Sequence, residues 1–230
     1  MQVPSNWLYP DSLEEAKKVQ NELASRVLLQ DDFNPLRLLG GMDVSNNPYD
    51  PKKMVYAAVV TLDVKSLTLE SKAHAAQQQP FPYIPGFLGF RESPPLIEAF
   101  QKLPKCPDLF LVDGQGISHP RRLGIASHIG VLLDIPTIGV AKNILVGKPQ
   151  GELGESIGDY IPLIANGEEV GVLLRTKSKC NPLIISPGHR ISLKTAIEIV
   201  LACMANYRLP EPTRHAHLTA NECRKNYSLS

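Results

Sequence analysis

The sequence predicts an α/β fold: a mixed five-stranded sheet flanked by helices, with additional strands and helices towards the C-terminus. Three observations support this fold class. Short apolar runs alternate with longer runs of helical periodicity. The first three apolar runs are joined by short connections, which favour an antiparallel meander. Later in the chain a strand, a helix and a strand follow one another closely, as in a parallel βαβ unit.

The N-terminal half begins with a predicted helix over residues 12–29. Ser12 and Glu15 have the spacing of a capping box, in which the two side chains satisfy free N–H groups at a helix start. Three strands are then predicted over residues 38–44, 54–62 and 67–75. Turn-forming residues separate these strands, and no helical pattern lies between them.

The central part continues with a helix over residues 86–103, a strand over 109–112, a helix over 121–133 and a strand over 137–141. The resulting order of elements is that of the ribonuclease H-like fold, where the first strand lies beside the fourth. That placement would bring Asp43, near the end of the first strand, next to Asp113 at the end of the fourth.

The C-terminal part has less regular patterning. Three possible short strands cover residues 161–164, 170–174 and 183–186. Two helices are predicted, one over residues 192–205 and one from about Glu211 onwards. The chain has no internal repeat, linker or low-complexity tract, so we expect a single domain over residues 1–230.

Composition excludes several classes of protein. The 230 residues carry a formal net charge of +1, so any basic surface must be local. The longest apolar stretch, residues 129–140, is interrupted by Asp134 and Pro136 and cannot span a bilayer. No signal peptide is visible at the N-terminus, and the four cysteines lack zinc-ligand spacing. We therefore expect a cytoplasmic protein with reduced thiols and no membrane association.

Acidic residues indicate a metal site. Asp43 and Asp113 each end an apolar strand, where a carboxylate costs desolvation energy unless it is paired or binds a cation. Two such carboxylates side by side would favour a divalent ion, and their oxygens suit Mg²⁺. Each could instead merely cap a turn. Glu92 could reach the same cation, although on its own an exposed glutamate in the first turns of a helix is the commoner interpretation.

The densest polar segment is the loop 113–122, which contains two glycines, His119 and two arginines. Such a loop suits phosphate binding at a helix start, but it has neither the Walker pattern nor the dinucleotide-binding pattern. An exposed basic loop is the alternative. Lys142 ends a central strand and could neutralise phosphate or orient a water, or it could extend into solvent. In the turn 82–86, Tyr83 is held between prolines and could either open a base stack or pack in a connector.

Taken together, these motifs resemble those of endonuclease V. The resemblance extends over nearly the whole chain and rests on YIPGFL at 83–88, FRE at 90–92, VDG at 112–114, GISHPRRLG at 116–124, PTIGVAK at 136–142, GHR at 188–190 and LPEPTR at 209–214. It implies a ribonuclease H-like fold and metal-dependent hydrolysis of the second phosphodiester bond 3′ to a deaminated base, such as inosine. The products would be a 3′-hydroxyl and a 5′-phosphate.

The resemblance also implies roles for particular residues. It maps the metal ligands onto Asp43, Asp113 and Glu92, with Mg²⁺ as the ion and Mn²⁺ as a substitute. Further catalytic positions are His119, Lys142 and His217, the last matching a histidine found in only part of the family. Tyr83 matches the strand-separating wedge, and the substrate-binding positions are Pro82, Tyr83, Ile84, Pro85, Gly86, Leu88, Gly116, Arg121 and Gly139. Among these, Gly116 and Gly139 would line the base pocket.

The implied partner is DNA containing deaminated bases, with inosine-containing RNA as an alternative, and we expect a monomer. Asn46 departs from the family pattern, which more often has an aromatic residue after Asp43-Val44-Ser45. Two other functions compete with this interpretation. A nucleotide-binding α/β enzyme would need a phosphate motif in its first βα turn, and the first three strands have no helix between them. A non-catalytic nucleic-acid-binding module would be expected to lack some of the three acidic residues.

Overall fold

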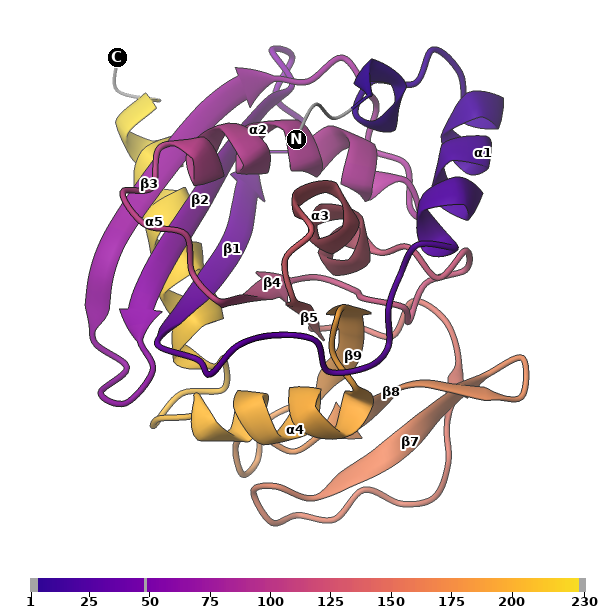
Figure 1. The fold of residues 1–230 in the computed structure, drawn as a ribbon, viewed down its shortest axis with the longest axis vertical. Coiled ribbons are helices and arrows are strands. Elements are labelled where there is room, and N and C mark those ends of the chain that lie inside the picture. The colour runs from indigo at the N-terminus through magenta and orange to yellow at the C-terminus, as the bar shows by residue number, and fades with distance from the viewer. Residues whose placement is uncertain (1–3, 48, 228–230) are drawn as a thin grey trace.

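A computed structural model describes residues 4–47 and 49–227, and its centre is a nine-stranded sheet in the order β3-β2-β1-β4-β5-β9-β8-β7-β6 (Figure 1). The pairs β1–β4 and β4–β5 are parallel, and the other pairs are antiparallel. The strands are β1 (Leu38–Asn46), β2 (Met54–Asp63), β3 (Leu69–Gln78), β4 (Leu109–Asp113), β5 (Thr137–Ala141), β6 (Lys148–Pro149), β7 (Tyr160–Ala165), β8 (Glu168–Leu174) and β9 (Leu183–His189).

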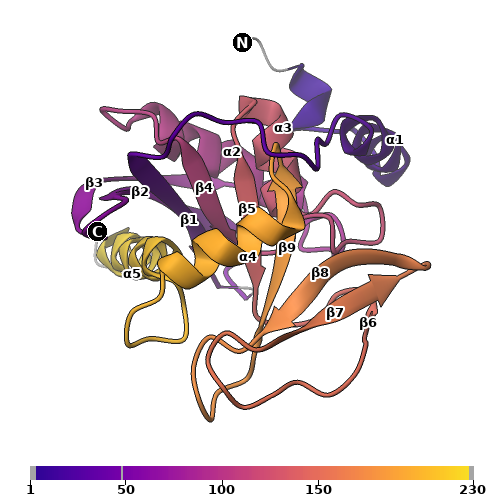
Figure 2. The same ribbon diagram turned by 60° about the horizontal axis from the view of Figure 1, so that its bottom comes forward.

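The helices lie in two layers, one on each face of the sheet. Helices α2 and α3 cover one face, while α4 and α5 cover the other (Figure 2). The helices are η1 (Ser5–Trp7), α1 (Leu13–Ala24), α2 (Leu88–Gln101), α3 (Ile125–Leu133), α4 (Leu193–Ala202) and α5 (Glu211–Tyr227). Within the described ranges, no helix combines the length and the apolar character that crossing a membrane requires.

The predicted five-stranded mixed core is confirmed. The strands β3-β2-β1-β4-β5 form one half of the sheet, with the antiparallel meander, the β4–α3–β5 unit and the β1–β4 adjacency that the sequence predicts. The strands of the C-terminal part extend this same sheet, because β9 pairs with the free edge of β5.

Several predicted element boundaries were wrong, for local reasons. Helix α1 ends at Ala24 rather than near residue 29. Directly after its last residue, the Ser25 hydroxyl donates to the Glu22 carbonyl and competes with helical hydrogen bonding. Helix α2 starts at Leu88 because Gly86 has a φ of 80°, which a right-handed helix cannot accommodate. Helix α3 starts at Ile125 rather than near residue 121, because Arg122 has a φ of 54°.

Alternation along β1 determines which side chains face the candidate site. Met42 packs in the core under α2 and α3, so Asp43, the next residue, points to the opposite face. Gly41 lies on that second face, where an added Cβ would come within 2.0 Å of the Pro212 carbonyl oxygen. This close approach lets the first turns of α5 pack directly on β1, which brings the following turn of α5 over Asp43.

Candidate active site

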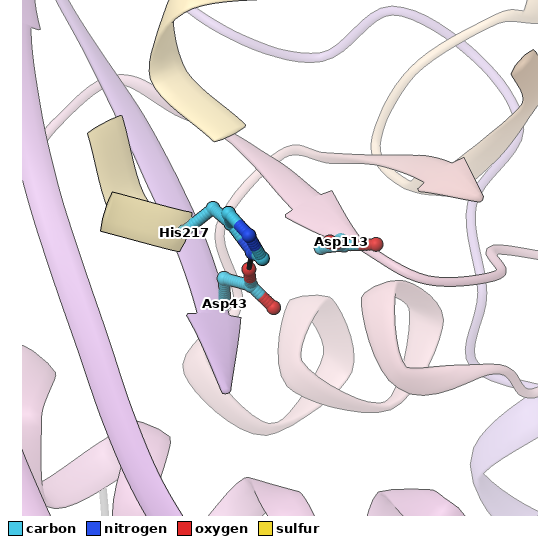
Figure 3. Close-up of side chains that lie close together, drawn as sticks. All are labelled: Asp43, Asp113 and His217. Carbon is cyan, nitrogen blue, oxygen red and sulfur yellow. Dashed lines mark hydrogen bonds and ion pairs between the residues drawn. The ribbon is translucent and has the colours of Figure 1, made fainter. Parts of the chain in front are cut away.

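The two strand-end carboxylates meet because β1 and β4 are parallel neighbours. Met42 is in register with Val112, so Asp43 and Asp113 follow at the same edge of the sheet. Each lies at or near the carboxyl end of its strand and faces the same side (Figure 3). The adjacency that the predicted strand order required is therefore present.

His217 completes this group from α5. Its Nδ1 lies 2.7 Å from Asp43 Oδ2, and single ligand atoms of Asp43, Asp113 and His217 all lie within 4.8 Å of one another (Figure 3). Asn221, one turn further along α5, places its amide nitrogen 3.0 Å from His217 Nε2, and Ser45 donates to the amide oxygen of Asn221 at 2.8 Å. The carboxylate of Asp43 is thus held by a polar chain that returns to β1.

No sequence motif pointed to Asn221. Its only sequence signal is its position, four residues after His217 on the same face of a helix. The hydrogen bond that His217 donates to Asp43 raises the pKa of His217 above its ordinary value.

Glu92 enters the same cleft from the first turns of α2 and is buried. Burial, followed by the charges of Asp43 and Asp113, raises the pKa of Glu92 to about 8. Burial and the charge of Asp43 raise the pKa of Asp113 to about 6. Lys142 Nζ contacts Asp113 and offsets part of this negative charge. The raised pKa values of Glu92 and Asp113 show that negative charge is crowded in this cleft, and a hard divalent cation would stabilise the ionised forms of both groups.

This clustering predicts an unusual dependence of stability on pH. Because the pKa of Glu92 is raised from 4.5 to about 8, the native protein binds more protons than the unfolded chain between these values. Without metal, stability should therefore fall as the pH rises through this window. We expect Glu92→Gln to raise the metal-free melting temperature at pH 8.5 by several degrees, and by much less at pH 5. A wild-type protein that is more stable than the variant at pH 8.5 would instead show that Glu92 is charge-paired.

The carboxylates lie in a cleft of about 420 Å³. Among the predicted substrate-binding residues, Tyr83, Gly86 and Leu88 line this cleft, and the Tyr83 side chain is exposed at its margin. Asn46 lines it too. The turn that carries Tyr83 also borders a second, apolar groove: Pro82 and Ile84 line that groove together with residues 8–13, while Pro85 is exposed.

Gly116 and Gly139 lie behind the cleft wall instead of on its surface. The Gly116 N–H donates to Ser186 Oγ at 2.8 Å, so this donor is already used within the protein. A Cβ at Gly116 would come within 2.0 Å of the Pro187 carbonyl oxygen, and one at Gly139 within 2.3 Å of the Gly116 nitrogen. These glycines let β5, β9 and the loop after Asp113 pack closely, so they shape the wall from behind.

His119 also lies at the cleft wall, where it contacts a peptide group rather than the carboxylates. Its Nε2 is 3.1 Å from the Gly86 carbonyl oxygen, and its Nδ1 accepts the Arg121 N–H at 3.2 Å. Burial, and secondarily the charge of Arg121, lowers the pKa of His119 to about 4. His119 is therefore neutral near pH 7, with the proton on Nε2. Arg121, predicted to bind substrate, donates to the same Gly86 oxygen at 2.6 Å.

Comparisons with known proteins agree with this geometry. The family model for endonuclease V matches residues 21–218. Endonuclease V of Protochlamydia amoebophila is 62% identical over 220 residues, covering 96% of this chain and 94% of the relative. A crystal structure of endonuclease V from Streptomyces avermitilis superposes with a TM-score of 0.90 at 41% identity, covering 98% of each chain.

A crystal structure of endonuclease V from Ciona intestinalis contains a 24-mer DNA with an inosine followed by a ribo-adenosine. It superposes on this chain with a TM-score of 0.80 at 28% identity, covering 94% of this chain and 98% of that one. The family match spans β1, β4, β5 and the start of α5, and it includes Asp43, Asp113, His217 and Lys142, the residue directly after β5. The chain belongs to the endonuclease V family.

Proposed function

We propose that this protein cleaves DNA at deaminated bases, hydrolysing the second phosphodiester bond 3′ to an inosine and leaving 3′-hydroxyl and 5′-phosphate ends. The observation that carries the proposal is a single cleft that combines three carboxylates with a wall of glycine peptides and apolar side chains beneath an exposed tyrosine. The inosine-containing DNA bound by the Ciona relative supports this choice of substrate.

Asp43, Asp113 and Glu92 would hold Mg²⁺, or Mn²⁺ in its place, because carboxylate oxygens are the ligands that these ions prefer. The raised pKa values of Glu92 and Asp113 support this assignment, since a bound cation would favour the ionised forms of both groups. When bound, the ion supplies Lewis-acid stabilisation of charge on the phosphate and on the leaving 3′-oxygen.

The remaining side chains position the reacting groups. Lys142, beside Asp113, places a cation at the carboxylate end of the cleft, where phosphate charge develops during attack by water. His217 orients the Asp43 carboxylate through its 2.7 Å hydrogen bond. At the margin, Tyr83 would enter the base stack as a wedge, so that the altered base can rotate out of the duplex.

The cleft wall would recognise the rotated base. Gly86, Gly114 and Gln115 bring peptide groups to the wall, and Leu88, Ile125 and Leu145 supply apolar surface. Inosine presents a carbonyl oxygen next to a ring N–H, whereas adenine presents the opposite donor and acceptor pattern. A wall matched to inosine would leave polar groups unpaired against adenine, at a cost of about 1–3 kcal/mol for each group.

The proposed function extends to an alternative substrate, the oligomeric state and the cellular location of the protein. Inosine-containing RNA is an alternative substrate, because the carboxylates and the base pocket do not themselves select the sugar. We further propose that residues 1–230 form a single domain that acts as a monomer in the cytoplasm. The four cysteines all lie within the described residues and are free.

Matched oligonucleotides with inosine, adenine or guanine at one position test the proposal. With Mg²⁺, inosine DNA should be cut at least about tenfold faster than adenine DNA, since one unpaired polar group accounts for about that factor. Guanine shares the carbonyl oxygen and the ring N–H of inosine, so its slower cleavage would depend on exclusion of the 2-amino group by size. A chelator should abolish cleavage, and the products should carry 5′-phosphate. Similar rates on all three bases would refute base recognition and favour a nonspecific or structure-selective nuclease.

A further inference from the structure

The carbonyl group of Gly86, directly after the Tyr83 turn, is held by three donors. Arg121 Nη2 donates at 2.6 Å, Gln20 Nε2 donates at 2.9 Å, and His119 Nε2 lies at 3.1 Å. The donors come from α1 and from the loop that precedes α3, so two distant segments of the chain meet at one oxygen. We refer to Gln20, His119 and Arg121 as the Gly86 clamp.

Gln20 joins the clamp through both ends of its amide. Its nitrogen donates to Gly86, and its oxygen accepts from Arg121 Nε. Gln20 is 1% exposed, because it lies on the face of α1 that packs into the core beside Val19 and Leu23. A buried amide costs free energy unless its hydrogen bonds are made, and here the clamp satisfies both ends of that amide.

The opposite end of the Tyr83 turn is fixed in a similar way. Arg91, which is buried, donates to the Phe81 carbonyl oxygen at 2.9 Å. At the clamp end, the Arg121 guanidinium carbon lies 4.3 Å from the centre of the Phe87 ring, which limits its movement. At each end of the exposed turn, a backbone carbonyl group therefore accepts a hydrogen bond from an arginine side chain.

We propose that Gln20 is a positioning residue for strand opening. By fixing Gly86 it keeps Tyr83 directed at the duplex and keeps the adjoining cleft wall in place. A wedge must resist the few kcal/mol that unstacking costs. Pro82, Tyr83 and Pro85 are exposed, so an unclamped turn would yield before the base stack opens. The inference rests on the proposed function, because it assigns Gln20 to the wedge of that activity.

The test compares Gln20→Glu with Leu23→Ala. The glutamate keeps the oxygen that Arg121 contacts but sets a second oxygen against the Gly86 carbonyl. Leu23→Ala loosens the packing of the same helix without removing a hydrogen-bonding group of the clamp, so it serves as the matched control. Gln20→Met, which removes both hydrogen bonds at similar length, replaces the glutamate variant if that variant does not fold. Melting temperatures verify folding.

Amide hydrogen exchange in the protein without DNA measures directly how firmly the clamp fixes the Tyr83 turn. The amides of residues 83, 84 and 86–88 should exchange about tenfold faster in Gln20→Glu than in the wild type, because local opening becomes easier, and the increase should be clearly smaller in Leu23→Ala. Unchanged exchange in both Gln20 variants would overturn the proposal. This readout needs neither substrate nor metal, so it remains informative even if the wild-type protein does not cut inosine DNA, which would refute the proposed function alone.

Cleavage rates on duplex and single-stranded substrates then distinguish a positioning role of Gln20 from a general loss of folding stability. Gln20→Glu should slow cleavage of an inosine-containing duplex about tenfold and cleavage of the matching single strand less than about twofold. Tyr83→Ala should show the same selectivity for duplex over single strand. The variant that combines Gln20→Glu with Tyr83→Ala should be no slower than Tyr83→Ala, since both changes act on the same wedge. Equal losses on duplex and single strand in Gln20→Glu would mean that Gln20 supports only the fold, and the inference would fail.

Discussion

Replacement of Asp113 by asparagine should lower the cleavage rate by about a hundredfold to a thousandfold, because a lost metal contact removes several kcal/mol of transition-state stabilisation and about 1.4 kcal/mol corresponds to tenfold. The change preserves the shape of the side chain and removes one of the three carboxylates in the cleft. It also removes the anion that Lys142 contacts. Asp43→Asn should have a similar effect, with the additional loss of the anionic partner of His217.

Rates are measured on inosine duplexes over a range of Mg²⁺ concentrations, and Mn²⁺ binding is followed by electron paramagnetic resonance. Duplex binding, measured by fluorescence anisotropy, should weaken far less than turnover. Asp134→Asn is a suitable control, because Asp134 has a φ of 53° that asparagine tolerates, and it ends α3 away from the cleft. Near-normal cleavage by Asp113→Asn at saturating Mg²⁺ would exclude Asp113 as an essential ligand.

The carboxylate pair could be predicted from sequence because short-range patterns give the order of elements, and analogy with the ribonuclease H-like fold then places the first strand beside the fourth. Brief connections between the first three strands require antiparallel pairing, and the later βαβ unit requires parallel pairing. With the first strand beside the fourth, Asp43 and Asp113 reach the same edge whatever the exact boundaries of the strands. The register of Met42 with Val112, which sequence patterns do not reveal, places both side chains on one side of the sheet.

The rest of the site depends on contacts between distant segments, which periodicity cannot reveal. His217 reaches Asp43 across 174 positions only because α5 packs on β1 at Gly41. The resemblance to endonuclease V pointed to His217, but no local pattern indicated Asn221. Gln20 was hidden for the same reason: it shares the buried face of an amphipathic helix, and its partners Gly86 and Arg121 lie 66 and 101 positions away.

The second large effect is expected at Gly139. An alanine Cβ there would lie 2.3 Å from the Gly116 nitrogen and 2.8 Å from the Gly114 carbonyl oxygen. Both are backbone atoms of the loop that follows Asp113, so the loop must move rather than a flexible side chain. Overpacking of this kind typically costs about 1–3 kcal/mol of stability. The displaced loop carries Gly114 and Gln115, which line the cleft.

We therefore expect Gly139→Ala to slow inosine cleavage about tenfold to a hundredfold, because displacements of about 1 Å can have effects of this size. Mn²⁺ binding should be retained better than in Asp113→Asn. Gly188→Ala is the matched control: its Cβ would meet Thr137 Oγ1 at 2.2 Å and the Thr137 carbonyl oxygen at 2.6 Å, a comparably tight contact at the first residue of β5. It should lower the melting temperature similarly and leave the ratio of inosine to adenine cleavage unchanged. If both variants lose activity only in proportion to stability, the glycine at 139 serves packing alone and does not shape base recognition.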